Sequence, residues 1–271
     1  MRRSMLARLA GLVGPVMLFA CQLSAAATTP APTASATHLP SATATSSPSA
    51  APSLMPTGTA TPAPSQTPTT TFTPSPTGTQ TPTPDPLAGA VLKLSDLPDG
   101  FAALTDADRE RLGFSDAALA RGYGKAFVSA QLHNTTGFVY SVDPNFQIVL
   151  AYLFYPLSNL ERATLDLSMS DPAVFTKAFV TGAGTVGAAS GSTITAKALP
   201  GMNKFGNKSV GVAAVITTAA GLKVHLDIVV VRRGDVFEVY NSIYPDKSQP
   251  LASLANLVKA LDARVAAVVT P

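Results

Sequence analysis

The sequence predicts a single domain of the α+β class in residues 87–271, with an antiparallel sheet of about six to seven strands flanked by two main helices. The run Ile148–Phe154 is apolar and of strand length, which indicates burial on both faces of a sheet. Strand-like segments between residues 210 and 244 are separated by turns short enough for antiparallel hairpins. The chain closes on an amphipathic helical pattern, whose apolar stripe needs a sheet to cover.

Residues 1–20 have the pattern of a lipoprotein signal peptide. Arg2, Arg3 and Arg8 give it a positive start, and Leu9–Ala20 forms its apolar segment. That segment is too short to span a bilayer, because a transmembrane helix needs about 20 residues. We therefore expect this part to direct export and to be removed.

Cys21 is the only cysteine of the chain and follows the signal directly. Leu18-Phe19-Ala20-Cys21 resembles the bacterial lipobox, although Phe19 departs from the small residue usual there. The resemblance implies cleavage before Cys21, a diacylglycerol on its sulfur and usually an added N-acyl chain such as palmitate, so that residues 21–27 form a lipidated N-terminus. Two or three acyl chains hold a protein at a membrane durably. Ordinary secretion with cleavage after Ala27 is the alternative.

Residues 28–86 differ from the rest of the chain in composition. They contain 18 Thr, 14 Pro and 8 Ser in 59 positions, and Asp85 is the only formal charge. Such a segment buries too little apolar surface to offset the entropy of ordering, which predicts a disordered linker. A Thr/Pro-rich tether after an acylated cysteine resembles bacterial surface lipoproteins. O-glycosylation of the linker or attachment to wall polymers is the alternative to a plain spacer.

The first half of the domain opens on a turn set by Pro98 and Gly100. A short polar helix is expected around Thr105–Leu112, and two or three strands are expected over 125–134 and 137–155. The break between those two ranges falls in Asn134-Thr135-Thr136, a glycosylation sequon that we interpret as turn chemistry.

A helix is expected to begin at Ser158, because Ser158 and Glu161 form a capping-box pattern. It should bend or restart at Asp171-Pro172, since proline cannot continue a helix without losing a hydrogen bond. A glycine-rich loop should follow, containing Gly182–Gly187.

The second half predicts four strands and a helix. The strands are Thr193–Leu199, Val210–Thr218, Leu222–Arg232 and Val236–Tyr244. Pro250 suits the start of the closing helix. Its apolar stripe comprises Leu251, Leu254, Val258, Leu261, Val265 and Val268.

The segment Gly182–Gly187 matches G-x-G-x-x-G, the loop that lets a pyrophosphate approach backbone amides. The context does not support a dinucleotide site. No acidic residue lies between Asp171 and Asp227 to hold a ribose hydroxyl, and no strand pattern precedes the glycines. We expect a flexible loop and no cofactor.

His225 and Asp227 are the candidate catalytic pair. They lie two residues apart on an expected strand, so they share a face at a separation of about 6.6 Å along it. A carboxylate that orients an imidazole begins many catalytic or metal sites. One exposed polar face of a sheet explains the same residues, together with Lys223. We assign no catalytic or metal-binding residue, and the sequence favours a protein that is not an enzyme.

Charge and cysteine content exclude several classes of function. The formal charge of +3 equals the three arginines of the signal, so the mature chain is neutral and gives no reason to expect nucleic-acid binding. Because no cysteine follows Cys21, the domain has no disulfide and no thiolate metal site. Residues 172–226 are basic, with Lys177, Lys197, Lys204, Lys208 and Lys223 and no acid. These lysines pair with acidic side chains of the segment 85–171, protect a sheet edge or form a basic patch.

The domain resembles exported sensor-type lipoprotein domains of the fold exemplified by the PsbP protein of photosystem II. The resemblance rests on the entry Asp96–Phe101, the strand-turn-strand unit around Arg233-Gly234 and the closing helix with Arg264. It implies an antiparallel sheet flanked by helices that serves binding or assembly. We therefore expect a lipid-anchored extracytoplasmic binding or sensor domain at the cell membrane. The alternatives are a cell-envelope hydrolase using His225 and Asp227 and a structural or assembly factor of the envelope.

Overall fold

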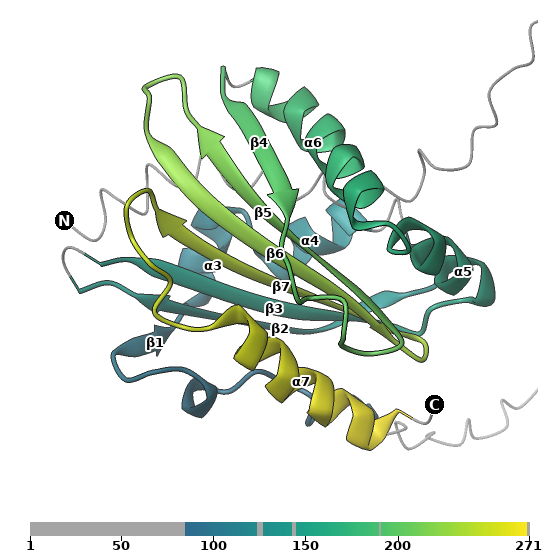
Figure 1. The fold of residues 1–271 in the computed structure, drawn as a ribbon. Helices are drawn as coiled ribbons and strands as arrows, with labels where there is room; N and C mark the ends of the chain where they lie inside the picture. Colours follow the sequence, from purple (N-terminus) through teal and green to yellow (C-terminus); the bar gives the residue numbers. More distant parts are fainter. Residues whose placement is uncertain (1–84, 124–126, 143–144, 190, 270–271) are drawn as a thin grey trace, which may run out of the picture. The chain divides into compact units, whose positions relative to one another are not determined.

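The computed structural model describes residues 85–123, 127–142, 145–189 and 191–269. They form a seven-stranded sheet in which every neighbouring pair is antiparallel, in the order β1-β2-β3-β7-β6-β5-β4 (Figure 1). The strands are β1 Phe101–Ala103, β2 Gln131–Tyr140, β3 Gln147–Tyr155, β4 Thr193–Ala198, β5 Lys208–Thr217, β6 Lys223–Arg233 and β7 Val236–Pro245.

Helices cover both faces of this sheet. They are the short 3-10 helix η2 Leu94–Asp96 and the α-helices α3 Asp106–Leu112, α4 Asp116–Tyr123, α5 Asn159–Ser168, α6 Pro172–Ala189 and α7 Leu254–Val268. One core joins residues of α3 to α6 to one face, which we call face A. A second core joins α7 and residues 87–97 to the opposite face, which we call face B. In Figure 1, α7 lies in front of the strands, and α3 and α4 lie behind them. The α+β class and the antiparallel sheet are therefore confirmed.

The apolar sequence of strand β3 follows from its central position in the sheet. It pairs with β2 on one side and β7 on the other, and both of its faces contact a core. All seven residues from Ile148 to Phe154 are at most 2% exposed. The unbroken apolar run is therefore the signature of a central strand in a three-layer arrangement.

The predicted helix starts are confirmed by their caps. The Thr105 hydroxyl accepts the Asp108 amide at 3.1 Å at the start of α3. Ser158 and Glu161 form the capping box of α5, in which the Ser158 amide donates to the Glu161 carboxylate at 2.7 Å. The Asp171 carboxylate accepts the Ala173 amide at 2.8 Å, which starts α6 immediately after the break.

The glycine-rich segment is helical, so the expectation of a flexible loop is wrong. Helix α6 runs through Gly182–Gly187 to Ala189, and it packs on β4 and β5. Each glycine costs a helix about 1 kcal/mol relative to alanine. Burial of Phe179 and Ala183 against face A offsets that cost. The same finding removes the phosphate-loop interpretation, because helical amides donate within the helix.

The sequon at Asn134 lies inside β2 and not in a turn. Its side-chain amide donates to the Leu87 carbonyl at 2.6 Å, and the strand passes it with a bulge between Leu132 and Asn134. Strand β2 begins at Gln131, later than the sequence indicated, and among the described residues from 127 to 146 it is the one strand before β3.

The three-strand meander β5-β6-β7 follows the prediction closely. Gly221 and Gly234 sit at its turns with φ of 76° and 57°, the left-handed region that suits glycine. Helix α7 begins later than expected, at Leu254 after the N-cap Ser253. Leu251 precedes the helix and is 40% exposed, and Val268 is 44% exposed at its end. The buried stripe is therefore shorter than the sequence pattern.

Residues 87–97 are held against the rest of the domain by polar contacts as well as by packing. Arg264 of α7 forms a bidentate ion pair with Asp96, at 2.6 and 2.7 Å, and also donates to the Val91 carbonyl at 3.0 Å. This ion pair lowers the pKa of Asp96. The entry segment and the closing helix, far apart in sequence, are thus joined.

None of the helices in the described part of the chain is both long and apolar enough to cross a bilayer. The signal peptide, Cys21 and residues 28–84 of the linker lie outside the described residues.

Candidate functional site

A surface cleft of about 420 Å³ opens between α4 and the start of β2. Its walls and floor include Ala117, Ala120, Ala130 and Phe154, and the remaining lining residues are Asp116, Gln131 and Leu132. We call it the alanine cleft, because its small side chains leave room for another molecule. Ligand pockets are commonly about 300–1,000 Å³ with mostly apolar walls.

The floor of the alanine cleft is part of a packed aromatic cluster. The Phe154 ring lies 4.7 Å from that of Tyr123 and 5.5 Å from that of Phe127, measured between centroids. Phe127 in turn contacts Phe237 at 5.0 Å. Aromatic pairs at these separations add packing energy beyond burial alone, so the floor is formed in the absence of a ligand.

The charged group at the rim is already partnered. Asp116 pairs with Arg109 at 3.0 Å, and the same guanidinium pairs with Asp106 at 2.6 Å. The cleft therefore presents apolar surface, with the Gln131 amide as its uncharged polar group.

A polar row lies within the face A core. The hydroxyls of Tyr123 and Tyr152 are 2.6 Å apart, and the Asn241 amide donates to Tyr152 at 3.2 Å. Among the described residues, Asn241 Oδ1 and Thr135 Oγ1 are buried without a hydrogen-bond partner. Buried polar groups of this kind are commonly satisfied by internal water.

His225 and Asp227 share face B, as predicted, but the structure does not bring them together as a catalytic pair. His225 Nε2 lies 3.1 Å from Asp246 Oδ1, and its ring stacks on Tyr244 at 5.0 Å. The Asp227 carboxylate accepts the Tyr244 hydroxyl at 3.0 Å. Each member of the expected pair thus has a different carboxylate or hydroxyl as its partner.

Burial raises the pKa of Asp227, although the Tyr244 hydrogen bond and the charges of His225 and Lys197 act in the opposite direction. Ser242 stands opposite Asp227 on β7, the register position of a possible nucleophile. Its hydroxyl accepts the Gln147 amide at 2.8 Å, and the residue is 1% exposed. Ser242 therefore supports the sheet and is inaccessible to substrate.

Metal binding finds no support in the described ranges, where no three His, Cys, Asp or Glu side chains converge. The five lysines of residues 172–226 form no ion pair with any described residue; Arg and His supply the cations of all ion pairs found there. Lys197 lies on the edge strand β4, as expected for a residue that protects a sheet edge.

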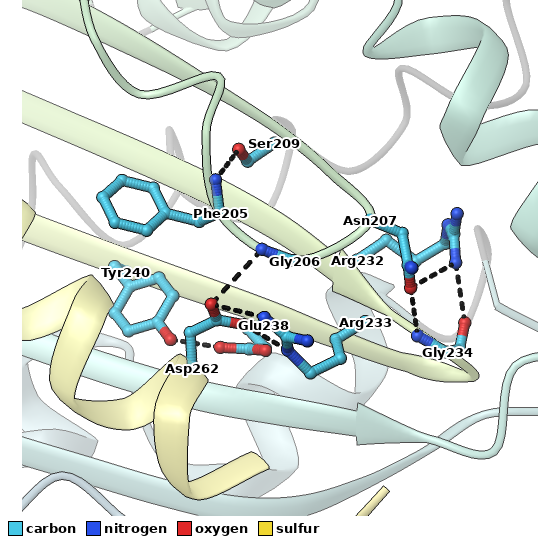
Figure 2. A network of polar contacts seen from close by, with 10 residues as sticks. All are labelled: Phe205, Gly206, Asn207, Ser209, Arg232, Arg233, Gly234, Glu238, Tyr240 and Asp262. Carbon is cyan, nitrogen blue, oxygen red and sulfur yellow. Dashed lines mark hydrogen bonds and ion pairs between the residues drawn. The ribbon is translucent and has the colours of Figure 1, made fainter. Parts of the chain in front are cut away.

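A second polar cluster lies beneath α7 (Figure 2). It comprises Arg233 of β6, Glu238 and Tyr240 of β7 and Asp262 of α7, and we call it the Glu238 cluster. Arg233 binds Asp262 through Nε at 2.6 Å and Nη2 at 2.8 Å. The Tyr240 hydroxyl donates to Glu238 Oε2.

Sequence reasoning missed both the alanine cleft and the Glu238 cluster. The cleft is formed where α4 packs beside the start of β2, and the alanines in the sequence do not indicate that packing. Glu238 did leave a signal, because it is a lone acid in the strand Val236–Tyr240 on the same face as Tyr240. A charge at that position of a strand is rare unless it is paired.

Comparisons with known proteins give little further information. No protein-family profile matches the chain, and no curated protein sequence matches it. An uncharacterised protein from Mycobacterium smegmatis, known from an X-ray structure, is similar over 64% of this chain and 78% of its own. The two are 17% identical with a TM-score of 0.29.

Proposed function

We propose that the protein is a lipid-anchored extracytoplasmic domain that binds a small, mainly apolar ligand in the alanine cleft. The observation that carries this proposal is the cleft itself, with its apolar walls and its preformed aromatic floor. The anchor is supported by the lipobox-like sequence before Cys21 and by the long Thr/Pro-rich tether.

Binding is favoured over hydrolysis because the Asp227 carboxylate accepts the Tyr244 hydroxyl, whereas the hydrogen-bond partner of His225 is Asp246. An envelope hydrolase using this pair would label with an activity-based probe, and the label would disappear in His225→Ala. An assembly factor of the envelope would instead return one stoichiometric protein in a cross-linking experiment on membranes. Either result would replace the proposal of ligand binding.

Ala120→Trp is expected to weaken binding of an apolar naphthalene fluorophore by at least about tenfold, because the indole fills the alanine cleft. Titrations monitored by fluorescence, with the detergent-solubilised full chain, would give the two affinities. Ala266→Trp is the matched control, since Ala266 is exposed on α7 and lies outside the lining of the cleft. Equal affinities in the wild type and Ala120→Trp would contradict a site in the cleft.

Cys21→Ser is expected to move the protein from the membrane fraction to the soluble fraction, because the acylated sulfur is lost. Fractionation of cells expressing either form tests this, and mass spectrometry of the mature N-terminus identifies the attached lipid. A wild-type N-terminus at Thr28 without acyl groups would show ordinary secretion and overturn the anchor. That result would leave the ligand site of the domain untouched.

A further inference from the structure

Glu238 is an acidic side chain in the middle of the second core. It is fully buried, and its neighbours on the adjacent strands are Leu153 of β3 and Val231 of β6. Oε2 accepts the Tyr240 hydroxyl, whereas Oε1 has no hydrogen-bond partner among the described residues. A carboxylate so far from water is strongly disfavoured unless a cation neutralises it.

Among the described residues, Arg233 is the cation that acts on Glu238, and it is already paired. Arg233 from β6 forms its two short contacts with Asp262 from α7, and Asp262 also accepts the Gly206 amide at 3.3 Å. Strand β7 contributes the Tyr240 hydroxyl, and β3 contributes apolar Leu153. Figure 2 shows Asp262 between the guanidinium and the loop that carries Gly206.

Counting these charges decides the protonation state. Two ionised carboxylates against one guanidinium would leave a net negative charge in an enclosed site, where Coulomb repulsion is weakly screened. A protonated Glu238 leaves a balanced Arg233–Asp262 pair in the cluster. Two carboxyl groups that share one site commonly hold one proton between them.

We propose that Glu238 is a proton-binding site that is occupied at neutral pH, and that loss of its proton releases α7 and the loop carrying Gly206 from face B. The proton is the ligand of this site. We call the Glu238 cluster the latch, because its contacts hold α7 and the loop carrying Gly206 on face B. The environmental role of this latch rests on the proposed extracytoplasmic location, but its operation does not.

The shift in the pKa of Glu238 agrees with this geometry. Burial, with a smaller contribution from the charge of Asp262, raises the pKa of Glu238 from 4.5 to about 8, against the effects of Tyr240 and Arg233. Glu238 would therefore lose its proton at a mildly alkaline pH of about 8, which a protein outside the cell can encounter.

Helix α7 and the loop respond together because Asp262 holds both. It is the residue of α7 that binds Arg233, and it also accepts the Gly206 amide. Gly206 has φ of 54°, and a Cβ there would lie 2.5 Å from the Arg232 carbonyl oxygen, so glycine is required where the loop approaches β6. Repulsion between two ionised carboxylates would act directly on this contact.

Amide hydrogen exchange of the full chain tests the latch without any ligand. Between pH of about 6 and 9, after correction for intrinsic exchange, protection of α7 amides is expected to fall by about tenfold or more in the wild type. In Glu238→Gln, which keeps the shape and cannot ionise, protection should not change with pH. Asp227→Asn is the matched control, since Asp227 also has a raised pKa but lies outside the cluster, and it should behave as the wild type.

An infrared measurement covers the case in which Glu238→Gln does not fold. The wild type should show the carbonyl band of a protonated buried carboxylic acid at neutral pH and lose it as the pH rises through about 8. Absence of that band at neutral pH would overturn the proton site. Protection of α7 that is unchanged across the same range, with the band lost, would overturn the latch. A wild-type protein that binds no apolar probe would contradict the alanine cleft and leave both of these results standing.

Discussion

The free energy of unfolding of the wild-type chain is expected to fall as the pH rises from about 5 to about 8. Glu238 has a pKa of 4.5 when unfolded and about 8 when folded. Between these values the folded state holds a proton that the unfolded chain has released, so stability decreases by about 1.4 kcal/mol per pH unit. The stabilisation by the Glu238 proton is fully present below the pKa of the unfolded state and is lost above the pKa of the folded state. It amounts in total to on the order of 5 kcal/mol.

Urea denaturation of the full chain at a series of pH values measures this slope. Glu238→Gln should remove most of it and should be the more stable protein at pH of about 8, where the wild type begins to bury a charge. The opposite trend, acid destabilisation, belongs to groups such as Asp96 and Asp85, whose pKa values are lowered. It appears at lower pH, so the two effects separate. A flat wild-type curve above pH of about 5 would refute the assignment of Glu238.

Arg233→Met is expected to destabilise the domain by about 3–5 kcal/mol, because it leaves the Asp262 carboxylate in the core without a cation. Asp262 is 7% exposed, so little water reaches its carboxylate, whereas the Arg233 side chain is 26% exposed. The double variant Arg233→Met with Asp262→Leu should recover most of this loss, since replacing both partners of a buried ion pair by apolar residues is often neutral.

Thermal or urea unfolding at pH of about 6, where Glu238 holds its proton, is the measurement. Arg111→Met on α3 is the matched control, because Arg111 pairs with Asp108 at the surface and such pairs contribute about 0–1 kcal/mol. Equal effects of the two single variants would show that the Arg233–Asp262 pair is not a buried ion pair in solution.

The second half of the fold was predictable because its information is local. Strands β5, β6 and β7 are joined by short turns that contain Gly221 and Gly234, and the apolar pattern of each strand is visible within its own segment. The capping box at Ser158 and the break at Pro172 also act through neighbours within one helical turn. These elements needed no knowledge of the rest of the chain.

The two wrong predictions of local structure, at Gly182–Gly187 and at Asn134, have one physical cause, which is tertiary packing. Gly182–Gly187 is helical because α6 lies on β4 and β5, a contact that outweighs the intrinsic preference of glycine. Asn134 continues a strand because its side chain bonds a carbonyl 47 residues earlier in the sequence. Neither contact is visible in a local window of the sequence.

The candidate sites follow the same division. The sequence placed His225 and Asp227 on one face correctly, because strand periodicity is local. It could not supply their partners Asp246 and Tyr244, which depend on the hairpin register. The alanine cleft and the Glu238 cluster each combine residues from at least three separate segments of the chain, so only the assembled fold reveals them.

The attachment of residues 87–97 determines how the domain would bear mechanical force. A pull on the chain ahead of Asp85 would first load the contact of Asp85 with His133 of β2 at 3.1 Å. It would then load the bond from Asn134 to the Leu87 carbonyl, and after it the ion pair between Asp96 and Arg264. The segment that makes these contacts precedes β1 in the sequence, so tension reaches the contacts before it reaches the edge strand β1. Because Arg264 belongs to α7, the last helix of the chain would share the tension applied at the start of the domain.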